Sequence, residues 1–394
     1  MRRLKKNIVL APTDLGNFLS CRHLSHRDLA AANGVVKRPV RYGPVIDELK
    51  ARGAAHEAAY LGFLEEQSLT VTRLGDELPA ADSAEGANTK TLAAIRSGVE
   101  VIYQASLSDE HWAGRADFLR RVEVPSDLGE WSYEVVDTKL ARDTRASTVL
   151  QLCVYTHLLG KLQGTRPALM HVVMPGVGYE PETYRADDYG AYFRLLERGL
   201  EAFVEVPDET YPDPVSHCDL CAWWSECESR RRGDDHLCYV AGIGGSQIAA
   251  LREMGIDRLS TLAQQEELPA PSHGSKEALE RARDQARVQL KGREQGKPYF
   301  EFRQPFDSEH GLALLPEPTH DDIFLDFEGN HFVEHGVQEY LTGYISQGSE
   351  GRDTYTSLWA RKPEEERQAF ERFIDQATAV RVRNPSAHIY HFAP

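Results

Sequence analysis

Three cysteines within ten residues constrain this chain more than any other feature of its sequence. Cys218, Cys221 and Cys227 have the spacing C-x2-C-x5-C, and thiolates at that spacing can converge on one soft metal centre without strain. A complete set needs a fourth ligand. Cys21 is the natural one, because a ligand from far upstream would fasten the first helix to the end of the same domain. Cys238 is the alternative fourth ligand.

The remaining cysteine usage points to thiol chemistry and not to disulfides. Six cysteines in 394 residues are too sparse for a disulfide framework. We expect Cys153, which lies in an apolar helical pattern, to be a buried free thiol. By chemistry alone, four cysteines suit Zn²⁺ as well as an iron-sulfur cluster.

Length, composition and charge exclude several classes of protein. A chain of 394 residues with 41% hydrophobic and 27% charged residues is expected to form at least two globular cores. No apolar run is long enough to span a membrane, and the basic N-terminus lacks a signal-peptide core, which predicts a cytoplasmic protein without membrane partners. The net charge of -16 argues against indiscriminate coating of nucleic acid, but the first 60 residues carry a net +6.

Hydrophobic periodicity predicts an α/β fold in the first region. The first 60 residues favour helices, with an N-cap at Thr13 or Asp14 and a second helix over 46–67. Runs rich in β-branched and aromatic residues then predict a meander of central strands, with the last over 131–141. A helix over 145–164, a strand over 168–176 and a helix over 191–205 follow.

The rest of the chain divides into two further parts. A Gly-x-Gly turn joins short helices in a small helical module over 236–300. Three strands, a helix and a final strand follow a linker, which predicts a second α/β domain that looks incomplete and belongs to a longer protein. We therefore expect domains at 1–232, 236–300 and 318–394.

One set of charged residues suits hydrolysis of a phosphodiester. Asp117 lies on a predicted strand, while Asp137 and Lys139 are two apart on another, so both side chains leave the sheet on one face. Carboxylates can hold a divalent cation, and a lysine can assist the attacking water or stabilise the developing charge. We expect the three side chains to converge on one metal.

At these residues the sequence resembles the PD-(D/E)xK nucleases of the RecB type, with a restriction-endonuclease-like core between helical flanks. The matching segments are RGAAHE at 52–57, GRADFL at 114–119, DTK at 137–139 and QLCVYTHLL at 151–159. An imidazole among the ligands would favour Mn²⁺ alongside Mg²⁺.

The resemblance implies a role for each matching residue. The metal ligands it implies are His56, Asp117, Asp137 and the carbonyl group of Thr138. It places Glu57 and Lys139 with the catalytic groups, Lys139 assisting the attacking water. It also gives Gln151 and Tyr155 the support of the site or of the DNA backbone.

The cysteines resemble those of the iron-sulfur subgroup of RecB-type nucleases. In that subgroup one N-terminal and three C-terminal cysteines hold a structural [4Fe-4S] cluster, which implies Cys21, Cys218, Cys221 and Cys227 here. The resemblance favours iron-sulfur over Zn²⁺.

Two further motifs resemble nucleic-acid-processing modules. The turn at Gly242 and Gly244 looks like a helix-hairpin-helix, whose backbone amides could bind a DNA phosphate. Asp326 and Glu328 lie two apart on a predicted strand, as in the first motif of RNase H-like exonucleases, where such a pair holds a divalent metal.

Together these features predict a metal-dependent DNA nuclease acting on single strands or ends, in repair or defence. No Walker A motif is present, and the resemblance implies a helicase as partner, in the same longer chain or separately. The alternatives are a non-catalytic DNA-binding or recruitment subunit and a nuclease acting on RNA.

Overall fold

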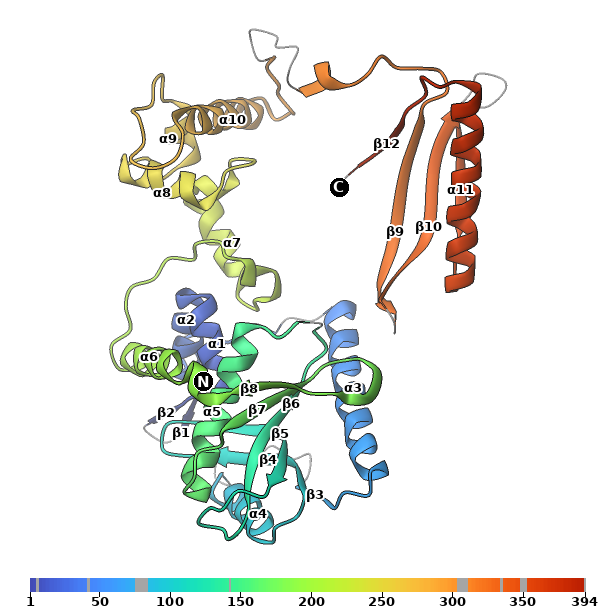
Figure 1. The fold of residues 1–394 in the computed structure, drawn as a ribbon. Coiled ribbons are helices and arrows are strands. Elements are labelled where there is room, and N and C mark those ends of the chain that lie inside the picture. Colours follow the sequence, from blue (N-terminus) through green and yellow to red (C-terminus); the bar gives the residue numbers. More distant parts are fainter. Residues whose placement is uncertain are drawn as a thin grey trace. The chain divides into compact units, whose positions relative to one another are not determined.

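The computed structural model describes residues 1–4, 7–40, 43–74, 84–141, 143–302, 311–333, 336–347 and 353–392 (Figure 1). The chain divides into two compact units, Met1–Tyr299 and Phe300–Pro394. Each combines a sheet with helices, which confirms the α/β class. No helix in the described part of the chain has the length and apolar character needed to cross a membrane.

A six-stranded mixed sheet forms the centre of the first unit, in the order β3-β4-β5-β6-β7-β8. The strands are β3 Val71–Arg73, β4 Val101–Ser108, β5 Ala113–Val122, β6 Ser132–Thr138, β7 Leu169–Val173 and β8 Glu182–Arg185. The antiparallel run β4-β5-β6 is the expected meander, and β7 joins β6 in parallel. Every residue of β6 is buried, which fixes the strand that carries Asp137 at the centre of the fold.

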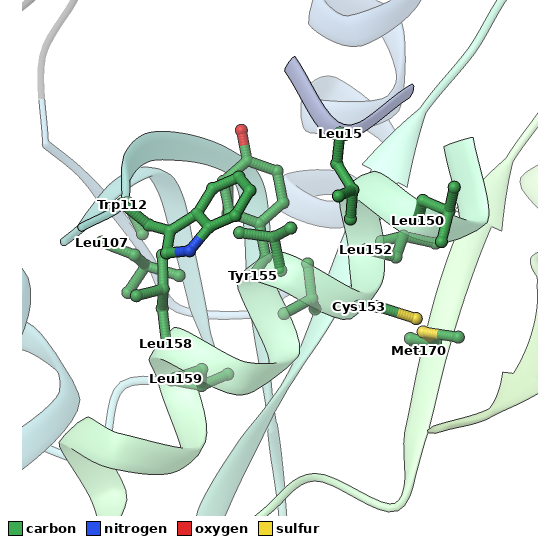
Figure 2. Packing of buried hydrophobic residues seen from close by; sticks show 14 of the residues in the cluster. Leu15, Leu107, Trp112, Leu150, Leu152, Cys153, Tyr155, Leu158, Leu159 and Met170 are labelled. Carbon is green, nitrogen blue, oxygen red and sulfur yellow. The ribbon is translucent and has the colours of Figure 1, made fainter. Parts of the chain in front are cut away.

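Helix α5, Ala146–Gln163, makes the crossover from β6 to the parallel strand β7. It is apolar around most of its circumference because it lies between the sheet and α1, Pro12–Ser20, and α6, Ala186–Glu205. Figure 2 shows its buried side chains, with Cys153 directed toward Met170 of β7. Cys153 is buried within this core. The predicted crossover helix is therefore confirmed.

The N-terminal segment differs from the expected all-helical start. Residues Arg2–Leu4 (β1) and Asn7–Val9 (β2) pair as a hairpin. Helix α1 begins at Pro12, and its N-cap is Ala11, whose N–H donates to Asp14 Oδ2 at 2.7 Å. The cap predicted at Thr13 or Asp14 is wrong because Pro12 has no N–H to lose and suits the first helical turn.

The first helix ends at Cys21, and a second helix begins directly after it. Cys21 is extended, with φ -161°, and separates α1 from α2, Arg22–Ala32. Its Sγ accepts a hydrogen bond from the N–H of Leu24 at 3.4 Å, so the thiol caps α2. The thiol of Cys21 therefore lies at the N-terminal end of α2 and not along the side of a helix.

Helix α3, Pro44–Glu66, lies on one face of the sheet, against β4, β5 and β6. Its contact is largely aromatic: the Tyr60 and Phe118 rings meet edge-on, 5.0 Å apart between centroids. Helix α4, Ala84–Arg96, packs on β4. The 3-10 turn η1, Val177–Tyr179, closes over α3 through the ring of Tyr179.

The end of the first unit is helical. Its elements are η2 Ser216–Leu220, α7 Trp224–Gly233, η3 Leu237–Tyr239, α8 Gly245–Glu253, α9 Leu259–Ala263 and α10 Lys276–Gln295. Those from η3 onward enclose an apolar cluster separate from the one beneath the six-stranded sheet. This is the small helical module predicted from the turn-then-helix pattern.

The second unit is a four-stranded sheet with one helix. After η4, Gly311–Leu314, come β9 Ile323–Val333, β10 Gly336–Gln347, β11 Asp353–Trp359, α11 Pro363–Arg383 and β12 Ile389–His391. The strand order is β11-β10-β9-β12, with β12 parallel to β9. Helix α11 covers one face through Phe373, and Phe324 and Ile345 are exposed on the other.

Gly114, on β5, provides a test of how the N-terminal segment is seated on the sheet. A Cβ there would lie 2.7 Å from Pro12 Cδ and 2.9 Å from Tyr155 Cε1. We expect Gly114→Ala to lower the free energy of unfolding by about 1–3 kcal/mol, because the ring and the tyrosine must both move. Urea unfolding measures this change.

The matched control is Gly62→Ala in α3, where a Cβ meets no atom within 4 Å. That change should leave stability unchanged or raise it by up to about 1 kcal/mol. Equal effects at the two glycines would contradict the close packing described for Gly114.

Candidate functional site

Asp117 and Asp137 meet at the point where β5 and β6 stop pairing. The register of these strands places Phe118 opposite Val136, so the two aspartates are the next residues outward. Asp117 Oδ2 accepts hydrogen bonds from both the N–H and the hydroxyl group of Thr138, each at 2.9 Å. The sheet itself therefore brings together the carboxylates that the sequence assigned to one metal.

Asp137 is the most constrained of these groups. It is 1% exposed, and its carboxylate oxygens have no ordinary hydrogen-bond donor in the described part of the chain. Burial and the charge of Asp117 raise its pKa to about 7, while its ion-pair partner Lys139 opposes that rise. A buried carboxylate with so few donors, next to a second carboxylate, is suited to a divalent cation, which would supply the missing positive charge.

Lys139 follows directly after β6 and remains partly exposed. Its Nζ forms the ion pair with Asp137 and also donates to the Thr138 carbonyl at 3.3 Å. Its backbone N–H donates to the carbonyl of Val173 on β7 at 3.0 Å. The ammonium group is thus held beside the carboxylates while part of it still faces solvent.

Glu57 adds a third carboxylate from α3. Burial and the charge of Asp117 raise its pKa, which places the two groups within electrostatic reach. The side-chain amide of Gln104, on β4, donates to Glu57 Oε1. Gln104 was not predicted from the sequence, where it stands as one polar residue in the apolar run VIYQASL.

His56 reaches the same region through the sheet backbone. Its Nε2 lies 3.2 Å from the Val173 carbonyl, which also accepts the N–H of Lys139. Its ring stacks on Tyr179 with 6.1 Å between centroids. The imidazole and the backbone N–H of Lys139 therefore share one acceptor, the Val173 carbonyl. The stacked ring of Tyr179 fixes the plane of the imidazole.

Gln151 and Tyr155 lie on the first half of α5. The Tyr155 hydroxyl donates to the carbonyl of Arg115 on β5 at 2.7 Å, and Gln151 hydrogen-bonds to Tyr155. Tyr155 is 4% exposed and its pKa is raised by burial. These two residues therefore support β5 close to Asp117.

Arg115 is a second residue that sequence reasoning did not single out. It is two residues from Asp117 and so projects from the same face of β5. Its Nη1 is buried and has no hydrogen-bond partner. A guanidinium with an unused donor beside three carboxylates is suited to an anionic oxygen of a bound ligand.

The four cysteines of the sequence pattern line one small cavity. Cys21, Cys218, Cys221 and Cys227 all contribute to its wall. Burial raises the pKa of Cys221 and raises that of Cys227 to about 11. Metal binding at this cavity would have to displace the thiol protons. Cys238 lines a different cavity, beside α8.

A buried hydrogen bond joins the two chain segments that carry these cysteines. The indole N–H of Trp223 donates to Asp28 of α2 at 2.8 Å, and Trp223 is 1% exposed. Arg27 of α2 stacks over the same indole, 5.0 Å from its ring centroid, and pairs with Glu226. These contacts bring Cys21 close to the C-terminal cysteines.

Arg231 of α7 lines the cysteine cavity as a buried cation. Its Nη1 donates to the Pro212 carbonyl at 2.9 Å, and its Nε has no hydrogen-bond partner. It is 5% exposed and has no carboxylate within ion-pair distance among the residues described. A metal centre held by four thiolates would give this cation a negative neighbour.

These clusters are not complete coordination spheres. Over the described ranges, no three His, Cys, Asp or Glu side chains already stand together as ligands of one ion. The carboxylates and the thiols are neighbours with suitable chemistry, and binding would require them to close around an ion.

The remaining predicted residues lie elsewhere. Gly242 has φ +75° in the turn before α8, and Gly244 is the N-cap of that helix, its N–H donating to Gln247 at 2.8 Å. Asp326 and Glu328 are both exposed on β9, on the face opposite α11.

The comparisons with known proteins identify no family. No family model matches the chain, and no curated protein matches it. A solved structure titled "Crystal structure of SSO0001" is similar over 58% of this chain and 89% of that chain, with 13% identity and a TM-score of 0.26. That likeness is too weak to assign a function.

The raised pKa of Asp137 gives a prediction about stability. Because its pKa is about 7 when folded and 3.8 in a free carboxyl, the metal-free chain should gain stability as pH falls from about 7 toward 4. At pH 8, Asp137→Asn removes the buried like charge and should raise the melting temperature of metal-free protein by roughly 2–4 °C. The same change should abolish stabilisation by Mn²⁺.

Differential scanning fluorimetry with and without Mn²⁺ measures both effects. Asp208→Asn, at an exposed aspartate, is the matched control and should change neither value. A lower melting temperature for metal-free Asp137→Asn would mean that the ion pair with Lys139 outweighs the repulsion from Asp117.

Proposed function

We propose that this chain is a divalent-metal-dependent nuclease of the RecB type that hydrolyses phosphodiester bonds in DNA. One observation carries the proposal: Asp117, Asp137 and Lys139 meet at the exit of two neighbouring strands, and among the described residues the buried carboxylate of Asp137 has only Lys139 as a charged partner. The D-x-K motif is common by chance and is usually a solvated pair on the surface. Here Glu57 of α3 and Tyr155 of α5 lie close enough to interact with the carboxylates of this site, which a solvated surface pair would not need.

Different residues have different proposed roles in hydrolysis. The residues proposed to hold Mg²⁺ or Mn²⁺ are His56, Asp117, Asp137 and the Thr138 carbonyl. The bound metal would polarise the phosphate and make water more acidic. Lys139 would assist the attacking water by orienting it from its place beside Asp137. Tyr155 and Gln151 hold β5 so that Asp117 stays in position.

Arg115 is suited to bind the scissile phosphate. Its unpartnered Nη1 offers a charge-assisted hydrogen bond to a non-bridging oxygen, where negative charge develops during the reaction. Its interaction with the charge of Glu57 keeps the guanidinium on the acidic side of the sheet.

The cysteine cavity is proposed to hold a structural [4Fe-4S] cluster through Cys21, Cys218, Cys221 and Cys227. Such a cluster would add to the link that Trp223 and Asp28 already make between α2 and the segment before α7. The resemblance of the cysteine pattern favours iron-sulfur, and Zn²⁺ is the alternative that the same thiols could bind.

The other modules fit a protein that processes nucleic acid. The turn at Gly242 and Gly244 precedes a helix N-terminus, which is suited to a phosphate contact. The second unit is proposed to be a partial RNase H-like domain, with Asp326 and Glu328 as its first acidic pair. Single-stranded DNA or DNA ends are the proposed substrate, with a helicase as partner and the cytoplasm as location.

The catalytic assignment is tested with Lys139→Ala. Loss of the ammonium beside Asp137 should lower Mn²⁺-dependent cleavage of DNA by at least about 100-fold, since a positioned proton-transfer group contributes that much. The assay compares single-stranded DNA, double-stranded DNA and RNA. Lys161→Ala, which removes an exposed lysine paired with Asp109 at the far end of α5, should keep full activity.

The outcomes separate the alternatives. Faster cleavage of RNA than of DNA would make the chain a ribonuclease. A wild type that binds DNA and cleaves neither substrate would mean a non-catalytic recruitment subunit.

The cluster assignment is tested by replacing the two candidate fourth ligands. After anaerobic purification, Cys21→Ser should lose most of its iron and visible absorbance, because three thiolates hold a cluster poorly. Cys238→Ser and Cys153→Ser should keep both, because neither sulfur lines the cavity of the other four. Zinc without iron or sulfide in the wild type would replace the cluster with a Zn²⁺ site.

A further inference from the structure

Gln104 has a backbone conformation that its sequence does not explain. Its φ is +59°, in the left-handed region that favours glycine, although it lies in the middle of strand β4. The residues on either side pair regularly, Tyr103 with Phe118 and Ala105 with Ala116. The strand is therefore interrupted at one residue, and its register continues unchanged.

The interruption lies directly across from the candidate active site. Because Tyr103 pairs with Phe118 and Ala105 with Ala116, Gln104 stands opposite Asp117 on β5. Non-glycine residues adopt positive φ at an energetic cost and keep it only when their surroundings compensate. A contact made by Gln104 must therefore offset the cost of its positive φ.

The side chain of Gln104 supplies that contact. Its amide nitrogen donates to Glu57 Oε1, across from β4 to α3, and the residue is 8% exposed. Glu57 is half-buried and is repelled by the charge of Asp117, and the side chains of Tyr103 and Gln104 both hydrogen-bond to it. An amide is a donor without charge, so it can stabilise Glu57 without competing for a cation.

Packing alone does not account for this residue. The aromatic contacts of α3 with the sheet involve Tyr60, Phe63 and Phe118 and do not include the glutamine. An apolar residue in ordinary strand geometry would fill the same run without backbone strain.

We propose that Gln104 is a positioning residue, whose left-handed backbone aims its amide at Glu57 and holds that carboxylate beside Asp117. The inference rests on the proposed nuclease function and deepens it, because it assigns the residue that keeps the carboxylate of α3 beside the metal ligand Asp117. Gln104 itself does not touch the reacting atoms.

Gln104→Gly separates positioning from stability. Glycine accepts the positive φ freely but has no amide, so Mn²⁺ should bind about tenfold more weakly or worse, as when other supporting partners of metal ligands are removed. The melting temperature of metal-free protein should change only as much as in Ser68→Gly. Ser68 also has positive φ, 61°, but is exposed at the end of α3 and away from the site.

A double-mutant cycle with Glu57→Ala gives the second readout. If Gln104 acts through Glu57, then Gln104→Gly should weaken Mn²⁺ binding in the wild-type background and have no further effect in Glu57→Ala. Isothermal titration with Mn²⁺, alongside DNA cleavage, measures all four proteins.

The results distinguish a failure of this inference from a failure of the proposed function. A wild type that cleaves DNA, with unchanged Mn²⁺ affinity in Gln104→Gly, overturns this inference and leaves the nuclease intact. Equal losses in both backgrounds of the cycle also overturn it, since Gln104 would then act elsewhere. A wild type that neither binds Mn²⁺ nor cleaves DNA overturns the proposed function and this inference together.

Discussion

The repulsion between the half-buried carboxylate of Asp117 and the buried carboxylate of Asp137 is the constraint on which the site depends. β-Strand pairing forces the two groups together, and the protein compensates only in part: Thr138 donates twice to Asp117, and Lys139 pairs with Asp137. Asp137 is left to the ammonium alone, and burial beside Asp117 raises its pKa. This arrangement destabilises the protein without a bound cation and becomes favourable when a cation binds. Functional sites generally differ in this way from the hydrophobic core, whose contacts stabilise the fold directly.

Residues with strained backbone conformations also gather around this site. Among the described residues, four that are not glycine have positive φ, and two of them, Gln104 and Tyr179, contact the neighbouring residues Glu57 and His56. Both therefore act on one turn of α3, although they come from β4 and from the turn after β7. These two contacts therefore add polar and stacking partners to a helix that otherwise packs on the sheet through apolar and aromatic side chains.

Local pattern predicted much of this fold, and long-range contacts account for what it missed. Alternation and helical periodicity sufficed for β4 to β7, for α5 and for the elements of the second unit. The strands Arg2–Leu4 and Asn7–Val9 are too short to show a period. Asp117, Asp137 and Lys139 were visible because their spacing is local, whereas Gln104 and Arg231 are defined by partners far away in sequence and had no local signal.

The same distinction explains why Cys21 could be proposed as a ligand before its position was known. Its partners are remote, but C-x2-C-x5-C is one ligand short, and that incompleteness is itself a local signal. The structure adds a reason that the pattern could not contain: Trp223, between Cys221 and Cys227, is anchored to Asp28, seven residues after Cys21. This bond holds α2 and the C-terminal cysteines together independently of the thiols themselves. A metal bound there would then reinforce an existing junction, and its loss should loosen α2 without unfolding the sheet that carries Asp137.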